Sequence, residues 1–170
     1  MKTLISKPAI YMLVCLALPL LIANCGLSEK TKKLYTAIEK KDRGEVERLL
    51  NKGADVNAST SGKVTYSPLL YCVVFSNDTE IAKILLEHGA KINARNNLGC
   101  TALHHAAMGG DHRKMVEFLI ANGADLSIKD DFGKRPLDFA QEELSRQENY
   151  EKTVDPEMKA IVVSLSNKSN

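Results

Sequence analysis

The sequence lacks several features by which common protein classes are recognised. It has no tryptophan and only 5% aromatic residues, and its four cysteines in 170 residues are too few for a disulfide-held scaffold. It also lacks an excess of charge, because Lys2 and Lys7 account for the whole difference between 23 basic and 21 acidic residues. Once these two lysines are set aside, no basic surplus remains to bind a phosphate backbone, and we expect no nucleic-acid partner.

Motifs for catalysis, cofactors and metals are missing as well. No G-x-S-x-G, P-loop, G-x-G-x-x-G or H-E-x-x-H pattern occurs. His104, His105 and His112 lie near one another in the sequence, but no cysteine or carboxylate accompanies them at metal-ligand spacing. We therefore expect no metal ion, no cofactor and no catalytic residue, and we interpret the chain as a protein other than an enzyme.

The composition is that of a globular protein with one domain, or with one domain and an appendage. Apolar residues make up 44% of the chain and charged residues 26%, which allows a packed core and argues against general disorder.

The N-terminal segment is typical of an export signal. Two lysines and no acidic residue precede the uncharged, apolar run from Ala9 to Ala23. As a helix this run would span roughly 22 Å, which is shorter than the ~30 Å hydrocarbon core of a bilayer, and Pro19 interrupts it. A plain membrane anchor is the alternative, because the uncharged stretch extends over Pro8–Ser28.

The residues after the apolar run resemble a bacterial lipobox. Leu21-Ile22-Ala23-Asn24-Cys25-Gly26 has a cysteine at the expected cleavage point, although Asn24 replaces the usual small residue. This resemblance implies that a signal peptide, residues 1–24, is removed and that Cys25 is lipidated, which would attach the protein to a membrane. Since Gly26 replaces the aspartate typical of inner-membrane retention, the resemblance favours the outer membrane of the cell envelope.

The rest of the chain contains an internal repeat. Ser67, Thr101 and Arg135 open similar segments and are spaced 34 residues apart, and Gly89 and Gly123 have the same spacing. Two landmarks with one period indicate a repeat array in which each unit buries its apolar side against its neighbours.

Each unit is predicted to be a pair of helices. The hydroxyls of Ser67 and Thr101 are suited to cap an inner helix, and Pro68 suits its first turn. Gly89 and Gly123 suit the left-handed conformation that ends an outer helix. The predicted inner helices are residues 69–75 and 102–108, and the predicted outer helices are residues 81–88 and 115–122.

This pattern resembles the ankyrin repeat. The unit Asn96–Lys129 carries it best, through Thr101-Ala102-Leu103-His104, with alanine where proline is usual. The resemblance implies an all-α solenoid of about four helix-turn-helix units joined by short finger loops, and it implies that His104 hydrogen-bonds to nearby backbone. The predicted divisions are a tether (25–30), an N-terminal capping repeat (31–58), a second repeat (59–94), a third repeat (95–128), a degenerate C-terminal capping repeat (129–166) and a tail (167–170).

The resemblance also implies a function in protein binding. Register with the variable positions of ankyrin repeats places five large apolar residues on the concave face: Tyr66, Phe75, Leu98, Met108 and Phe132. Together they would form an apolar patch rimmed by charge. The alternative is that Val74 and Phe75 pack between repeats. We also expect Cys72 to be buried and Cys100 to be accessible.

We interpret the chain as a membrane-anchored, monomeric scaffolding lipoprotein that binds a protein in the bacterial cell envelope. Two alternatives stay open. One is a secreted or cytosolic ankyrin-repeat effector that binds a host protein, and the other is an envelope accessory protein that protects against stress.

Overall fold

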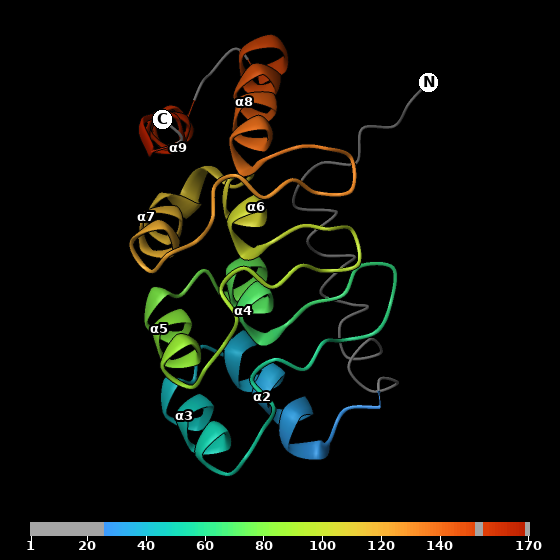
Figure 1. The fold of residues 1–170 in the computed structure, drawn as a ribbon. Helices are drawn as coiled ribbons and strands as arrows, with labels where there is room; N and C mark the ends of the chain where they lie inside the picture. The colour runs from blue at the N-terminus through green and yellow to red at the C-terminus, as the bar shows by residue number, and fades with distance from the viewer. Residues whose placement is uncertain (1–25, 152–154, 169–170) are drawn as a thin grey trace.

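The computed structural model of the protein describes residues 26–151 and 155–168 (Figure 1). The predicted signal peptide, residues 1–24, and the predicted lipidation site Cys25 lie outside these residues. None of the described helices has both the length and the apolar composition that are needed to cross a bilayer.

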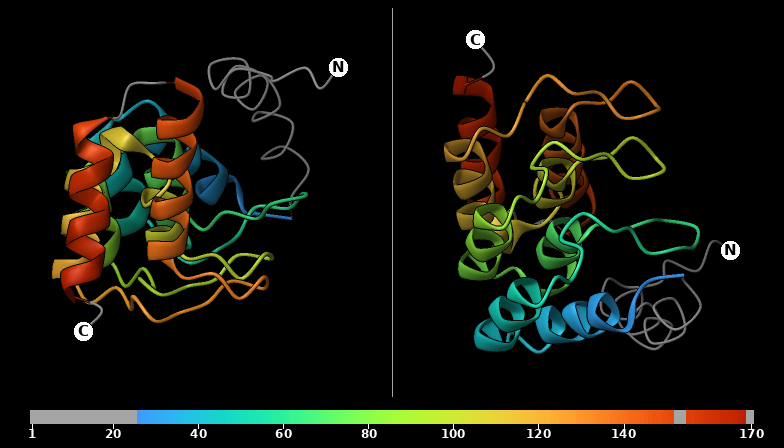
Figure 2. Two further views of the ribbon diagram at one scale, coloured as in Figure 1. Left: turned by 90° about the horizontal axis from the view of Figure 1, so that it is seen from above. Right: turned by 60° about the horizontal axis from the view of Figure 1, so that its bottom comes forward.

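The helices form two layers that are stacked in chain order (Figures 1 and 2). The layer beside the finger loops consists of α2 (Glu29–Glu39), α4 (Pro68–Tyr71), α6 (Ala102–Ala106) and α8 (Pro136–Arg146). The outer layer consists of α3 (Arg43–Asn51), α5 (Thr79–Glu87), α7 (Arg113–Ala121) and α9 (Pro156–Lys168). No β-strand occurs in residues 26–151 or 155–168, and the predicted all-α solenoid of helical hairpins is confirmed.

Short polar side chains begin most of these helices. The carboxylate of Asp78 accepts hydrogen bonds from the N–H groups of Glu80 and Ile81 at the start of α5. Ser28 and Asp42 accept equivalent bonds at α2 and α3. Because these N–H groups have no partner inside a helix, the side chains fix the residue at which each helix begins.

The two helices of a hairpin are joined differently in the second and third repeats. After α4, one turn of π-helix, η1 (Cys72–Ser76), continues the chain to Asn77, which has a left-handed φ of 49°. After α6, the chain turns and forms a 3-10 segment, η2 (Gly110–His112). The connection between the paired helices is therefore a π-helical turn in the second repeat and a 3-10 segment in the third.

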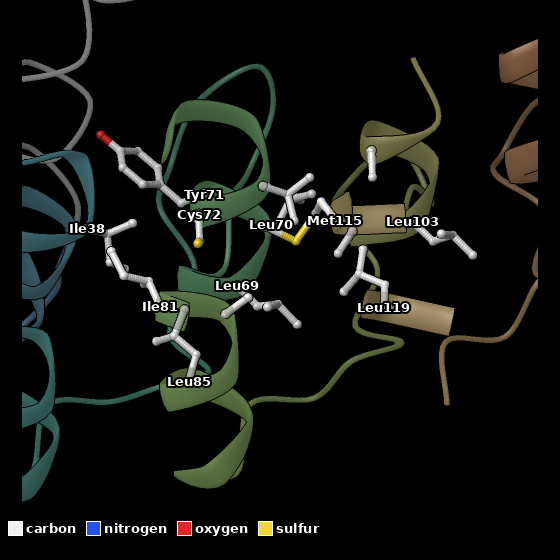
Figure 3. Packing of buried hydrophobic residues seen from close by; sticks show 14 of the residues in the cluster. Ile38, Leu69, Leu70, Tyr71, Cys72, Ile81, Leu85, Leu103, Met115 and Leu119 are labelled. Atoms are coloured by element: carbon white, nitrogen blue, oxygen red, sulfur yellow. The ribbon is translucent and has the colours of Figure 1, made fainter. Parts of the chain in front are cut away.

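The core lies between the two layers and is continuous through the stack (Figure 3). Leu69 and Leu103 from the inner layer and Ile81, Leu85 and Leu119 from the outer layer are all buried. Burial of each such side chain contributes about 1.5–3 kcal/mol. Since every interface joins consecutive repeats, stability depends on the stacking of neighbours rather than on one central core.

Asparagines at the bases of the fingers connect consecutive repeats. Asn57 donates from its amide to the carbonyl of Gly89 (2.9 Å) and accepts from the N–H of Lys91 (2.9 Å). One repeat later, Asn93 makes the same pair of bonds to Gly123 (3.4 Å) and Asp125 (2.9 Å). These bonds hold the repeats in register and position the fingers that flank the candidate site.

Candidate protein-binding groove

An open groove of about 620 Å³ lies beside the end of the array, between the inner helices of the last repeats. We call it the α8 groove and define it by the residues that line it: Val74, His105, Met108, Gly109, Asp111, His112, Phe139, Glu142, Glu143 and Arg146. Its volume falls in the range of about 300–1,000 Å³ that is typical of ligand-binding clefts.

The unequal lengths of the inner helices explain why the groove is there. Helix α6 has 5 residues, whereas α8 has 11 and continues into a π-helical turn, η3 (Gln147–Glu151). The second half of α8 therefore has no equally long helix beneath it. Glu142, Glu143 and Arg146 from this half form one wall of the groove, over the turn that follows α6.

The floor of the groove is apolar. Met108 is 42% exposed, which is unusual for a large apolar side chain beside a core, and Val74 and Phe139 are half-buried. Burial lowers the pKa of His105 to about 4, and the neighbouring His104 and His112 lower it further in the same direction. His105 is therefore neutral at physiological pH and adds no charge to the floor.

The wall contributed by α8 is acidic. Three residues of α8 that line the groove are charged, and two of them, Glu142 and Glu143, are acidic, whereas Arg146 is basic. Glu142 forms an ion pair with Lys134 (2.7 Å), and Glu143 forms one with Arg146 (2.7 Å). Across the groove, the side chain of Asp111 is 84% exposed. The carboxylates of Glu142 and Asp111 can thus be reached by water and by a bound partner, whereas the side chain of Glu143 is only 12% exposed.

Charge is distributed unevenly along the stack. The first hairpin, residues 26–53, contains eight basic and five acidic residues, whereas residues 129–166 contain six basic and nine acidic residues. The array is therefore basic at its first repeat and acidic at its last, where the α8 groove lies.

Two of the five apolar residues predicted for binding lie in an aromatic cluster. Tyr66 and Phe75 are half-buried, and their ring centroids are 5.5 Å apart. Phe75 also contacts the buried ring of Tyr71 at 4.5 Å, and burial raises the pKa of Tyr66. The structure therefore gives Phe75, and also Val74, contacts with the core between repeats.

The other three residues are not all in one place. Met108 is the only one of the five that lines the α8 groove. Phe132 is 76% exposed in the turn of the last finger, and Leu98 is half-buried in the turn of the preceding finger. The two turns are joined by a hydrogen bond from the N–H of Asp131 to the carbonyl of Leu98 (3.1 Å). The structure thus places Met108 in the α8 groove, Tyr66 and Phe75 in the aromatic cluster, and Leu98 and Phe132 in the finger turns.

The residues predicted to shape the repeats lie at helix ends. Ser67 accepts from the N–H of Leu70 (3.3 Å), and Pro68 is the first residue of α4. Gly89 and Gly123 follow α5 and α7 with φ values of 86° and 89°. These φ values lie in the left-handed region that glycine adopts without steric cost.

Thr101 and His104 form the cap of α6. The ring Nδ1 of His104 accepts from the backbone N–H of Thr101 (3.1 Å). Burial lowers the pKa of His104, so the neutral ring that can accept this bond is favoured.

The expectation that Cys100 is accessible is wrong. Its exposed fraction is only 7%, because the finger folds so that its sulfur lies under the carbonyl of Leu98 (4.0 Å). Burial raises the pKa of Cys100 to about 11 and that of Cys72 to about 12. Both are free, buried thiols that stay protonated at physiological pH.

Within the part of the chain that the structure describes, no group of three or more potential ligand side chains gathers as a metal site. The described His104, His105 and His112 lie close together, but they serve as a helix cap, as the groove floor and as part of the groove lining.

Sequence reasoning did not single out Phe139, Asp111 or Arg146. The signal that was available is the length and acidity of residues 136–151, which we interpreted only as the polar end of the array.

Comparisons with known proteins agree with this architecture. The family model described as ankyrin repeats (three copies) matches residues 13–96, 34–130 and 70–154. The chain is 38% identical over 78 residues to an ankyrin repeat protein of Acanthamoeba polyphaga mimivirus, which covers 44% of this chain and 11% of that protein. It is 30% identical over 111 residues to an ankyrin repeat protein of Rickettsia bellii, which covers 65% of this chain and 53% of that protein.

A third relative is the B-cell lymphoma 3 protein homolog of Mus musculus, which is 34% identical over 108 residues, or 64% of this chain and 23% of that protein. The chain thus spans between 11% and 53% of the length of these three relatives.

Proposed function

The chain belongs to the ankyrin-repeat family, and we propose that it is a lipid-anchored scaffold that holds another protein at the bacterial cell envelope. Ankyrin repeats are protein–protein interaction modules. The observation that carries the proposal for this chain is the α8 groove, whose apolar floor and charged rim are the anatomy of a protein-binding site.

The proposed anchor is supported by the sequence around Cys25 and by the position of the first helix. Helix α2 begins at Glu29, and Ser28 caps it, so only three residues separate Cys25 from the folded array. Leu27 already packs against the core. A lipid on Cys25 would therefore hold the first repeat directly at the membrane surface, since three residues reach at most about 11 Å.

Lipidation is tested by replacing Cys25 with alanine in the full chain, expressed in bacteria. We expect the wild-type protein to partition into the detergent phase and to incorporate labelled palmitate, and Cys25→Ala to do neither. Cys15→Ala is the matched control, because Cys15 lies within the apolar run and should leave both properties unchanged. If Cys25→Ala partitions and incorporates label like the wild type, lipidation of Cys25 is refuted and the plain membrane anchor over Pro8–Ser28 is favoured.

Protein binding is tested by site-specific photo-crosslinking in cells. A photoreactive amino acid replaces Met108 in the α8 groove or, as a control, Lys83, whose exposed side chain lies on the outer helix α5. We expect a discrete crosslinked protein from position 108 that is absent from position 83. Equal products from both positions, or none from position 108, would exclude the groove as the binding site.

A further inference from the structure

We propose that the α8 groove binds a basic segment of the partner protein, with one aliphatic side chain of that segment seated between Met108 and Phe139. This inference rests on the proposed function, because it names the chemistry of the partner that the groove would hold.

The shape of the groove favours a short peptide segment over a flat protein surface. Its walls come from the turn after α6 and from the second half of α8, so it receives a side chain from the open side. Met108 has a flexible thioether side chain, which adapts to an inserted aliphatic chain, and Phe139 has a planar apolar ring. Removing the 42% exposed Met108 from water also provides a direct hydrophobic gain on binding.

The charge of the rim favours a basic segment. Three carboxylates line the groove, those of Asp111, Glu142 and Glu143, and Arg146 is the only arginine or lysine among the lining residues. Arg146 contacts Glu143 through both Nε (2.9 Å) and an Nη atom (2.7 Å), which holds its charge beside a carboxylate. An arginine or lysine that flanks the apolar side chain of the ligand would therefore meet Glu142 and Asp111.

The ion pair between Glu142 and Lys134 does not block such an approach. The side chain of Glu142 is 59% exposed and that of Lys134 is 42% exposed. Exposed pairs of this kind contribute only about 0–1 kcal/mol, so an incoming guanidinium can share or replace the lysine. An acidic segment would instead meet like charge, because the carboxylates of Asp111, Glu142 and Glu143 outnumber the one arginine among the lining residues.

The floor does not oppose a cationic ligand either. His105 lies on the floor and is neutral, because burial lowers its pKa to about 4. The groove thus presents acidic groups at its rim and uncharged groups at its base, which complements an apolar side chain between two cationic ones.

The experiment measures binding of short fluorescein-labelled peptides to the full chain in neutral detergent, by fluorescence anisotropy. The basic peptide has one leucine with two arginines on each side. Its matched forms replace the arginines by glutamates, replace the arginines by serines, or replace the leucine by glycine. We expect only the basic peptide with leucine to bind well, and we expect its affinity to fall as salt is raised.

The same measurement on variants of the protein then shows whether the basic peptide binds in the α8 groove. We expect Glu142→Gln and Asp111→Asn each to weaken binding of the basic peptide about threefold, as the loss of an exposed charge contact would. Met108→Ala should weaken it about tenfold, as the loss of a central apolar contact would. Glu87→Gln is the control, because the Glu87 side chain is 60% exposed on α5, away from the groove. All four positions are exposed, so these variants should fold normally.

The outcomes separate this inference from the function on which it rests. Equal or tighter binding of the serine or glutamate peptide, or equal loss of affinity in Glu87→Gln, overturns the basic ligand. If no peptide binds while position 108 still crosslinks to a protein, the basic chemistry is wrong and the groove remains a binding site. Failure of crosslinking at position 108 contradicts the proposed function itself.

Discussion

The ring Nε2 of His104 lies 3.1 Å from the carbonyl oxygen of Lys134, across the boundary between the third and fourth repeats. The other ring nitrogen accepts from the N–H of Thr101 at the start of α6. One neutral imidazole therefore caps its own helix and ties the next finger to it, which requires a proton on Nε2 and none on Nδ1.

We predict that His104→Ala lowers the free energy of unfolding by about 3 kcal/mol, because it removes a fully buried ring that caps α6 and donates to the Lys134 carbonyl. Chemical denaturation at neutral pH measures the change. His88→Ala is the control: His88 bonds to Ile84 and Asn51 at a more exposed position, so its loss should cost about 1 kcal/mol or less. Similar losses in both variants would contradict the bridging role of His104.

We predict that the protein loses stability as the pH falls from about 6.5 toward about 4. The pKa of His105 is lowered to about 4 in the folded chain from an ordinary value of 6.5, mainly by burial. Between these values the unfolded chain binds a proton that the folded chain does not, so the stability present above pH 6.5 declines on acidification. The whole effect amounts to about 3 kcal/mol.

His104 adds to this decline, because its pKa is also lowered. Urea denaturation at several pH values above 4.5, where most carboxylates stay ionised, gives the free energy of unfolding at each pH. The slope of this free energy against pH is compared between the wild type and His105→Leu. The slope should become shallower in the variant. An unchanged slope would show that His105 is not the group responsible.

We predict that Gly99→Ala is far more damaging than Gly123→Ala, although both glycines have positive φ values. A methyl group at Gly99 would meet the carboxylate of Asp131 and lie 2.7 Å from its backbone nitrogen, whereas nothing lies within 4 Å of one at Gly123. Gly123→Ala should cost about 1–2 kcal/mol for its left-handed backbone alone, and Gly99→Ala should cost more. Thermal unfolding compares the two, and equal shifts in Tm would show that the fingers relax freely.

We predict that Phe75→Ala and Phe132→Ala separate packing from recognition. Phe75 contacts Tyr66 and Tyr71, so its truncation should cost about 3 kcal/mol in unfolding experiments. Phe132 is 76% exposed, so its truncation should change stability by no more than about 0.5 kcal/mol while it weakens capture of the partner. A large stability loss for Phe132→Ala would identify it as a core residue.

The parts of the fold that sequence predicts well are set by local chemistry. Ser67 caps α4 through its hydroxyl, and Gly89 adopts a left-handed φ after α5, so both act within a few residues and their pattern is visible without coordinates. The accessibility of Cys100 was predicted wrongly because it depends on how a finger folds over its own sulfur. The contributions of Phe139, Asp111 and Arg146 to the α8 groove were missed because they depend on the difference in length between α6 and α8, which no single repeat reveals.

The uneven distribution of charge gives the molecule an electric dipole along the stacking axis. Its positive end is the hairpin of residues 26–53, and its negative end is formed by residues 129–166. Near any negatively charged surface such a rod turns its first repeat toward the surface and stands upright, within about a Debye length. The α8 groove at the acidic end would then face away from that surface, toward proteins that approach from the aqueous side.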